Sequence, residues 1–189
     1  ALFGFLNSLF KLLRDESPDY LAAVFDGKEK TFRHKMYPEY KATREKMPDE
    51  LREQLPYMWK LIEAMNIPRL EIAGYEADDI LATLATQARE AKIETIVITG
   101  DRDSYQLVED PYVKVLYNRR GVSDYILFDE EGIRERTGVA PIDYVKYAAL
   151  RGDKSDNLPG VPGVGEKTAA KLVNEFGTLD AIFESADQQ

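Results

Sequence analysis

Apolar residues recur at helical spacing in three stretches of the chain. They return every three or four positions and predict helices over residues 1–14, 48–66 and 76–91. Pro48 is typical of a helix start, whereas Pro56 falls inside the second stretch and predicts a kink there. The first half of the chain is therefore predicted to be rich in helices.

Short apolar runs rich in β-branched and aromatic residues predict the strands. These runs lie at residues 20–25, 94–99, 112–117 and 125–128. A turn is predicted at residues 118–121, and the pattern from residue 129 onward is helical. Because the strands alternate with helices, we expect an α/β fold, with a mostly parallel sheet and flanking helices, followed by a helical C-terminal module.

The composition is that of a folded globular protein, with 44% hydrophobic and 31% charged residues. The chain has no cysteine, which excludes disulfides and thiolate metal sites and favours a reducing cytoplasm. We find no apolar run long enough to span a membrane and no secretory signal. The net charge of −9 argues at first sight against a nucleic-acid partner. Residues 28–46, however, hold seven Lys and Arg against three Glu, a local charge of +4.

Acidic residues cluster where apolar segments end or helices begin. Four clusters contain eight carboxylates: Asp26; Glu76, Asp78 and Asp79; Asp101 and Asp103; Asp153 and Asp156. The carboxyl ends of parallel strands meet at one edge of a sheet, so we expect these groups in one cleft. Carboxylates packed together repel and raise one another's pKa, so such a cleft needs a cation. Oxygen ligands suit a hard divalent ion such as Mg²⁺.

Each acidic cluster alone has an ordinary explanation. Acids in the first turn of a helix, as at residues 76–79, are stabilised by the helix dipole. Asp is also a common helix cap, which accounts for residues 101–103, and residues 153–156 could form a capped turn. Only the conjunction of the four clusters favours metal binding.

A glycine-rich run follows the last acidic cluster. It contains Gly160, Gly163, Gly165, Lys167 and Thr168. The run is not a P-loop, because Glu166 stands where lysine is required and no strand precedes it, and it lacks the third glycine of a dinucleotide fingerprint. It fits a helix–hairpin–helix at about residues 141–176, whose turn contacts a phosphodiester backbone without reading sequence.

The basic segment, residues 28–46, interleaves cationic side chains with aromatic rings, among them Arg33, Tyr40, Lys41 and Arg44. A run of charges is as often only a solvated face. Aromatic rings between bases also provide stacking surfaces beside phosphate contacts, a pattern typical of single-strand binders. Because the chain has no second histidine, we interpret His34 as structural.

In this order, the motifs resemble those of the 5′-nuclease domain of bacterial DNA polymerase I, a member of the flap-endonuclease family. The resemblance covers essentially the whole chain. It implies a PIN-like or resolvase-like nuclease core over residues 1–128, with the basic segment as a helical arch, and a helical module over residues 129–189. The implied activity is that of a structure-specific 5′-3′ exonuclease or flap endonuclease. Such an enzyme removes DNA flaps or RNA primers in replication and repair.

The resemblance further implies that the eight clustered carboxylates hold two or more Mg²⁺ or Mn²⁺ ions. Four of them would serve the first ion: Glu76, Asp78, Asp79 and Asp101. Asp103, Asp153 and Asp156 would tend to the second ion, and Asp26 would share the metal role.

The remaining motifs would contact DNA. By the same resemblance, Arg33, Lys41 and Arg44 would steady the scissile phosphate, and Tyr40 would pack against bases. The hairpin, with its glycines, Lys167 and Thr168, would grip a duplex, with K⁺ between its carbonyls and a phosphate. The implied partner is DNA with a 5′ flap, nick or RNA primer, bound by a monomer.

The chain departs from the family pattern at its start. The family begins with a strand and an Asp-Gly pair before the first helix, whereas this sequence opens inside the helix, so we expect a fragment that lacks this strand and the polymerase portion. Two other functions stay open. A DNA-binding module without catalysis would use the hairpin and the basic segment, and a small-molecule phosphohydrolase would have no use for the hairpin.

Overall fold

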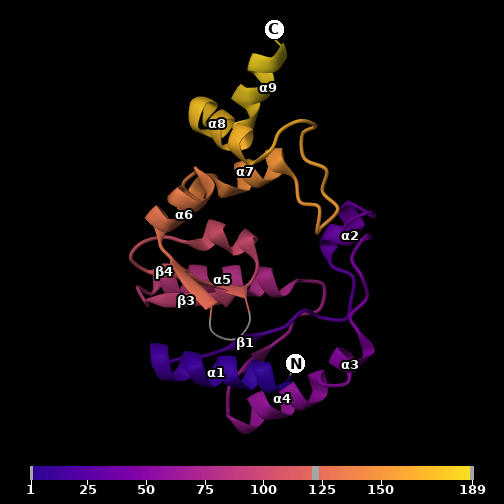
Figure 1. Cartoon of the computed structure of the whole chain (residues 1–189), viewed down its shortest axis with the longest axis vertical. Helices are drawn as coiled ribbons and strands as arrows, with labels where there is room; N and C mark the ends of the chain where they lie inside the picture. The colour runs from indigo at the N-terminus through magenta and orange to yellow at the C-terminus, as the bar shows by residue number, and fades with distance from the viewer. Residues whose placement is uncertain (1, 121–123, 188–189) are drawn as a thin grey trace.

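The computed structural model describes residues 2–120 and 124–187 (Figure 1). The helices are α1 (Leu2–Glu16), α2 (Phe32–Met36), α3 (Asp49–Arg52), α4 (Leu55–Ala64), α5 (Ala77–Glu90), α6 (Glu130–Thr137), α7 (Tyr144–Arg151), α8 (Glu166–Phe176) and α9 (Leu179–Asp187). The strands are β1 (Ala23–Val24), β2 (Arg69–Leu70), β3 (Thr95–Thr99), β4 (Val113–Arg120) and β5 (Asp124–Phe128), and the 3₁₀ helices are η1 (Arg102–Leu107) and η2 (Pro141–Asp143). None of the described helices is long and apolar enough to cross a membrane.

The described strands form two small sheets. β1 pairs in parallel with β2, and β3 pairs in parallel with β4, which pairs antiparallel with β5. The predicted α/β class with mostly parallel pairing is confirmed, although the sheet is divided rather than continuous. Asp26 follows the end of β1 by two residues, and Asp101 follows the end of β3 in the same way.

Most of the predicted helices are present. Residues 1–14 and 76–91 correspond to α1 and α5, and the region after residue 129 holds α6 to α9. The helix predicted over 48–66 is divided into α3 and α4. Pro56 lies in the first turn of α4, where a residue without an N–H donor is tolerated, so the predicted kink is a break between two helices.

Two strand predictions are corrected. Residues 20–25 contribute only the two residues of β1, because the partner strand β2 is itself two residues long. Residues 118–120 of the predicted turn belong instead to β4, which continues to Arg120, and Gly121 lies outside the described residues. The strands predicted at 94–99, 112–117 and 125–128 are confirmed as β3, β4 and β5.

One buried core joins the three-stranded sheet to the helices that follow it. The Tyr105 ring packs edge-on against Phe128 and Tyr144, with centroids 5.2 Å and 5.6 Å apart. Tyr147 packs on Tyr144 at 5.5 Å, and Val173 of α8 belongs to the same core. Each aromatic pair contributes about 0.5–1.5 kcal/mol beyond the area it buries. This core fixes α7 and α8 against the sheet.

The loop between α7 and α8, residues 152–165, returns toward the basic segment. It runs beside α2 in Figure 1. The backbone N–H of Lys41 donates to the carbonyl of Asp156 at 3.0 Å, and the Asn157 side chain donates to the carbonyl of Glu39 at 2.8 Å. The fold thus places the last acidic cluster next to the basic segment.

Candidate active site

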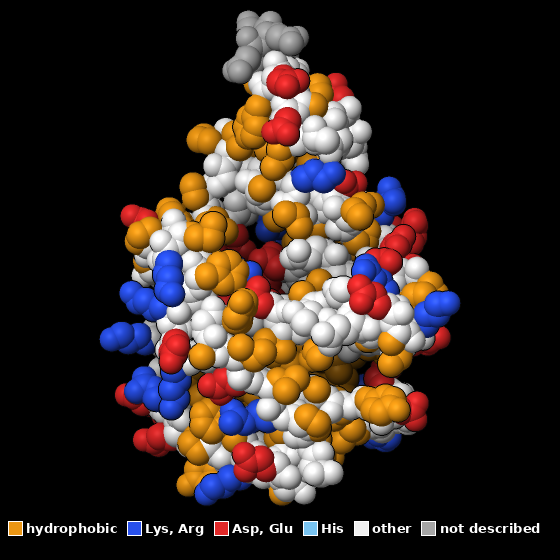
Figure 2. Space-filling view, turned by 180° about the vertical axis from the view of Figure 1, so that it is seen from behind, with side chains coloured by type: hydrophobic (Ala, Val, Ile, Leu, Met, Phe, Trp, Pro, Cys, Tyr) orange, Lys and Arg blue, Asp and Glu red, His pale blue; other side chains and the backbone are white. Residues whose placement is uncertain are grey.

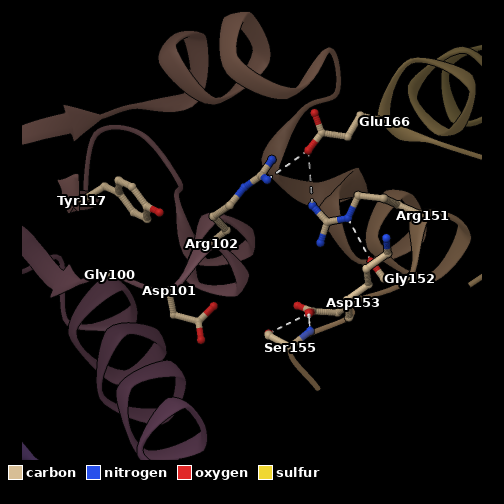
Figure 3. A pocket seen from close by; sticks show the side chains of 10 residues that line it. Gly100, Asp101, Arg102, Tyr117, Arg151, Gly152, Asp153, Ser155 and Glu166 are labelled. Carbon is tan, nitrogen blue, oxygen red and sulfur yellow. Dashed lines mark hydrogen bonds and ion pairs between the residues drawn. The ribbon is translucent and has the colours of Figure 1, made fainter. Parts of the chain in front are cut away.

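A cavity of about 450 Å³ lies between the carboxyl end of β3 and the helical module. It is lined by residues 100–102 after β3, by Arg151 at the end of α7 and residues 152–155 after it, and by Tyr117 and Glu166 (Figure 3). From the opposite side to Figure 1, the surface shows a hollow with acidic side chains at its bottom (Figure 2). Two of the four acidic clusters, at residues 101–103 and 153–156, contribute to this cavity.

The start of α5 carries the second acidic cluster. Glu76 is the N-cap and is only 6% exposed, and its backbone N–H donates to Oδ2 of Asp79 at 3.0 Å. Asp26 accepts a hydrogen bond from the N–H of Ala77 at 2.7 Å, which joins the end of β1 to α5. This capping role explains why acidic residues are favoured at the start of the helix. The carboxylate oxygens that take no part in capping point toward the residues that pack against the start of α5.

The other two clusters organise tight turns. Asp101 caps η1 by accepting a hydrogen bond from the N–H of Asp103 at 2.9 Å. Asp153 accepts hydrogen bonds from both the N–H and the hydroxyl of Ser155 at 2.7 Å. These contacts follow the ordinary turn chemistry of aspartate. Among the described residues, these hydrogen bonds use one oxygen of each carboxylate.

Two carboxyl groups of the site hold their protons more tightly than usual. Burial raises the pKa of Asp78 to about 6, and the neighbouring carboxylates Asp101 and Asp26 add to the effect. Burial also raises the pKa of Asp103 to about 6, with further contributions from Asp101 and Asp153. The acids therefore form two overlapping sets that share Asp101.

Cations of the basic segment pair with acids of the α5 cluster. Arg33 donates two hydrogen bonds to Asp79, at 2.8 Å and 2.7 Å, and this guanidinium lowers the pKa of that carboxyl. Lys41 donates from Nζ to Oε2 of Glu76 at 2.8 Å. A bidentate arginine–carboxylate pair is among the stronger interactions that a partly buried site can hold.

The last acidic cluster also has a cation, because Arg44 pairs with Asp156. The Tyr40 hydroxyl lies 2.9 Å from Oδ2 of Asp156 and 3.0 Å from Oε2 of Glu76. Burial and the adjacent Asp156 raise the pKa of Tyr40 well above its usual range, so the hydroxyl keeps its proton. The residue is 7% exposed. The base-stacking role of Tyr40 stays a prediction, and it requires the ring to become exposed when DNA binds.

His34 has a structural position, as its sequence context predicts. Its Nδ1 lies 3.2 Å from the backbone nitrogen of Thr31, which caps α2, and its ring packs edge-on against Tyr40 at 5.3 Å. Sequence reasoning did not single out Thr31, whose buried hydroxyl donates to Glu76 at 3.4 Å. A threonine before a short helix carried no signal that it would face an acid in a distant element.

The acids do not form a ready-made metal cage. In the described part of the chain, no three acidic or histidine side chains converge closely enough to hold a metal ion as they stand. The possible ligands are nevertheless all oxygen atoms, which suits Mg²⁺ or Mn²⁺. Asp78 and Asp103 are each repelled by neighbouring carboxylates, and a divalent cation relieves repulsion of this kind. Arg33 occupies both oxygens of Asp79, whereas Lys41 contacts only Oε2 of Glu76, so an ion at Asp79 would compete directly with the arginine.

The raised pKa values predict how the stability of the metal-free protein depends on pH. A folded-state pKa of about 6 for Asp78 and Asp103, against an ordinary 3.8, means that the folded form binds more protons than the unfolded form between about pH 4 and 6. Their stabilising effect is thus present at low pH and is lost as pH rises through about 6. The lowered pKa of Asp79 acts below this window and does not offset the loss.

We therefore expect the melting temperature in EDTA to fall between pH 5 and pH 7. The loss is on the order of 1 kcal/mol for each group, once solvent screening is allowed for. Thermal melts at pH 5, 6 and 7 measure it, and the double variant Asp78→Asn with Asp103→Asn should flatten the dependence. A wild-type melting temperature that rises across this range contradicts the assignment.

The glycines of the hairpin have two different roles. A Cβ on Gly160 would lie 2.4 Å from the backbone nitrogen of Gly152, so these two residues cross in close backbone contact. A Cβ on Gly163, at φ +81°, or on Gly165 would meet no described atom within 4 Å, and both residues lie open to solvent. Lys167 is exposed in the first turn of α8, as is Thr168. Gly160 therefore shapes the loop, whereas the other two glycines leave space for a ligand.

Two arginines at the cavity were also missed by sequence reasoning. Arg102, between two of the predicted acids, donates to Oε1 of Glu166 at 3.0 Å, and Arg151 approaches the same oxygen at 4.0 Å (Figure 3). Their position beside acidic clusters was visible in the sequence. Their shared partner was not, because Glu166 is 64 residues from Arg102.

Comparison with known proteins agrees with this architecture. Residues 1–138 match the family model of the 5′-3′ exonuclease N-terminal resolvase-like domain, and residues 139–189 match that of the 5′-3′ exonuclease C-terminal SAM fold. DNA polymerase I of Mycobacterium tuberculosis is 50% identical over 187 residues, which are 99% of this chain and 21% of that protein. The chain thus spans about a fifth of the length of this relative.

Solved structures share the fold. The T5 flap endonuclease, solved in complex with DNA and metal ions, has a TM-score of 0.78 at 23% identity, over 97% of this chain and 70% of that one. The catalytic core of Rad2 with DNA substrate has a TM-score of 0.61 at 21% identity, over 98% of this chain and 58% of that one. With both family models matched along its length, the chain belongs to the 5′-3′ exonuclease family.

Proposed function

We propose that this chain is a structure-specific 5′-3′ exonuclease or flap endonuclease that hydrolyses phosphodiester bonds of DNA or of an RNA primer on DNA. The observation that carries the proposal is the arrangement of the carboxylates in two sets that share Asp101. Asp101 and Asp153 line the cavity beside Glu166 at the end of the hairpin, whereas Asp26 and Glu76 line a second pocket together with Lys41 and Arg44 of the basic segment. Family membership supports it, and so does the fold shared with a flap endonuclease solved with DNA and metal ions. Its substrate would be DNA with a 5′ flap, nick or RNA primer.

Two or more Mg²⁺ or Mn²⁺ ions would be held by the clustered carboxylates. Asp26, Glu76, Asp78 and Asp101 form the first set, with Asp79 next to it in the first turn of α5. Asp101, Asp103, Asp153 and Asp156 form the second set. When bound, such ions lower the pKa of an attacking water and neutralise the leaving oxygen of the phosphodiester. The protein's part is to hold the carboxylates on short turns and on a helix start, which restricts their movement.

Arg33, Lys41 and Arg44 would act on the scissile phosphate. In the structure each of them neutralises a carboxylate that an ion would also neutralise. Once that charge is supplied by an ion, the same cations are free to form charge-assisted hydrogen bonds to phosphate oxygens. Each cation would thus exchange its carboxylate partner for a phosphate oxygen when an ion binds, and this exchange would couple ion binding to contact with the substrate.

The hairpin would hold the duplex. Gly163 and Gly165 leave room for a close approach, and the start of α8 offers N–H groups that no side chain caps. Lys167 and Thr168 would add a charge and a hydroxyl to the same phosphate contact. K⁺ between hairpin carbonyls and a phosphate would complete the grip. Such contacts position DNA without reading its sequence.

A second function, DNA binding without catalysis, is favoured by one observation. Glu76, Asp79 and Asp156 are paired with cations, and among the described residues no three acids converge around one point. If these ion pairs persist when DNA binds, the acids only balance the charge of the basic segment.

Cleavage of a labelled 5′-flap duplex in Mg²⁺ distinguishes the two functions. Incision near the junction, which EDTA and Asp79→Ala both abolish, supports a metal-dependent nuclease. Binding of the duplex without incision at any Mg²⁺ or Mn²⁺ concentration supports the binding module. Hydrolysis of p-nitrophenyl phosphate without cutting of DNA contradicts both.

We expect Lys41→Ala to slow flap cleavage more than Gly163→Ala does. Loss of one cation that stabilises the reacting phosphate costs about 10²–10³ in rate. An alanine at Gly163 meets no neighbouring atom among the described residues, so it adds only the strain of a positive φ, about 1–2 kcal/mol, and weakens the duplex grip. Single-turnover rates at saturating enzyme separate the two effects. The reverse order would move the catalytic cation elsewhere.

A further inference from the structure

An ion-pair cluster joins the helical module to the cavity. Glu166, Arg102 and Arg151 converge, with Nη1 of Arg102 at 3.0 Å and Nη1 of Arg151 at 4.0 Å from the same Oε1 of Glu166 (Figure 3). The side chains of Arg102 and Arg151 are 28% and 13% exposed, whereas Glu166 is 55% exposed. We call these three residues the Glu166 cluster.

Each member of the Glu166 cluster belongs to a different part of the site. Arg102 is the first residue of η1 and directly follows Asp101, which the two acidic sets share. Arg151 donates from Nε to the carbonyl of Gly152 at 3.0 Å, directly before the Asp153 turn. Glu166 itself is the first residue of α8, directly after the hairpin. The cluster thus ties the hairpin to both loops that carry acids.

The cluster is poorly suited to a purely stabilising role. A salt bridge with a half-exposed partner contributes at most about 1 kcal/mol to stability. The buried core beneath already holds α7 and α8 on the sheet. Val161 and Val164 of the hairpin pack against this core, whereas Gly163 and Gly165 are exposed. The Glu166 cluster adds a polar connection from the end of the hairpin to the segments that carry the acids.

We propose that Glu166 is a positioning residue, which sets the distance between the duplex grip and the acidic cavity and thereby selects the phosphodiester that is cut. The inference rests on the proposed nuclease function. An anchored hairpin holds the duplex in one register relative to the carboxylates. A loosened hairpin still binds phosphate but presents several neighbouring bonds to the site.

Glu166→Gln tests the proposal, because it keeps the size of the side chain and removes the charge that both arginines share. On a 5′-labelled flap duplex, we expect the single main incision site to spread over adjacent phosphodiesters, while duplex affinity changes by less than about threefold. Glu175→Gln is the matched control: the same change on an exposed residue of the same helix should leave the cutting pattern unchanged.

The arginine side of the cluster provides a second test. Arg102→Lys retains a cation that can reach Glu166 and should keep the wild-type pattern, whereas Arg102→Gln should reproduce the spread. The double variant of Arg102→Gln with Glu166→Gln should be no worse than either single variant, because both changes remove one interaction. Additive effects overturn the assignment of these residues to one cluster.

A distance measurement tests the proposal without cleavage. Because the chain has no cysteine, spin labels can be placed at Glu94→Cys, near β3, and Lys171→Cys, on α8, both exposed. We expect Glu166→Gln to broaden the distance distribution between the labels, and Glu175→Gln to leave it unchanged. An unchanged distribution together with an unchanged cutting pattern overturns the proposal. If the wild-type chain cuts no DNA, the nuclease function fails, whereas the distance result still decides whether the cluster positions the hairpin.

Discussion

Replacement of Asp101 by alanine should reduce the rate of flap cleavage by about 10³-fold or more, while duplex affinity stays within a few-fold of wild type. Asp101 raises the pKa of both Asp78 and Asp103, so it lies between the two acidic sets. Under the proposed function both ions would share this group, so its loss would remove several kcal/mol of charge stabilisation, and each ~1.4 kcal/mol is tenfold in rate. The hairpin and the basic segment, which would bind the duplex, are left intact.

Single-turnover cleavage and duplex binding, both in Mg²⁺, measure this effect. Asp19→Ala removes an exposed carboxylate from the loop after α1 and serves as the control, with wild-type cleavage expected. A second consequence follows in the metal-free protein: without Asp101 the pKa of Asp78 and of Asp103 should both move down toward the ordinary value. Cleavage by Asp101→Ala at the wild-type rate would show that the ions bind elsewhere.

Replacement of Gly160 by alanine should destabilise the protein by about 2–5 kcal/mol and abolish cleavage. The added Cβ would lie 2.4 Å from the nitrogen of Gly152 and 2.6 Å from the carbonyl carbon of Arg151, both backbone atoms that cannot turn away. Gly160 also has φ +63°, which strains any other residue. Overpacking and backbone strain therefore act together. Because the same loop carries Asp153 and Asp156, its displacement removes the second acidic set.

Urea unfolding compares Gly160→Ala with Gly163→Ala, which has a similar positive φ of +81° but no described neighbouring atom within 4 Å. The difference between the two variants isolates the cost of the backbone contact. Gly152→Ala should behave like Gly160→Ala, since its Cβ would lie 2.6 Å from the nitrogen of Gly160. An equal loss of unfolding free energy in Gly160→Ala and Gly163→Ala would show that only the strain of the positive φ matters. It would also show that the backbones at Gly152 and Gly160 can move apart.

The elements with a strong local pattern could be predicted from the sequence. The run of β-branched residues at 94–99 forms β3, and the helical spacing at 76–91 forms α5. The short strands β1 and β2 have no comparable signal, because two paired residues leave no periodicity to detect. The division of the sheet depends on long-range pairing, which no local pattern records.

The positions of the acidic site residues could be predicted from the sequence, but the side chains with which they pair could not. Aspartates at strand ends and helix starts follow from local chemistry, and those expectations place Asp26 and Asp101 where the structure has them. The pairing of Arg33 with Asp79 spans 46 residues, and that of Arg44 with Asp156 spans 112. Such contacts arise only once the fold brings distant charges together. Burial of Tyr40 was missed for the same reason.

The aromatic core that runs from Tyr105 through Tyr144 to Tyr147 has a consequence for modularity. The chain carries two family domains in sequence, yet its largest buried side chains come from both of them. Transfer of residues 139–189 alone to another scaffold would separate Tyr144 from its ring partner Tyr105 and leave this aromatic packing incomplete. We therefore expect the two halves to be inherited together. A chimera that exchanges one half must also exchange the aromatic residues of the other half that pack against it.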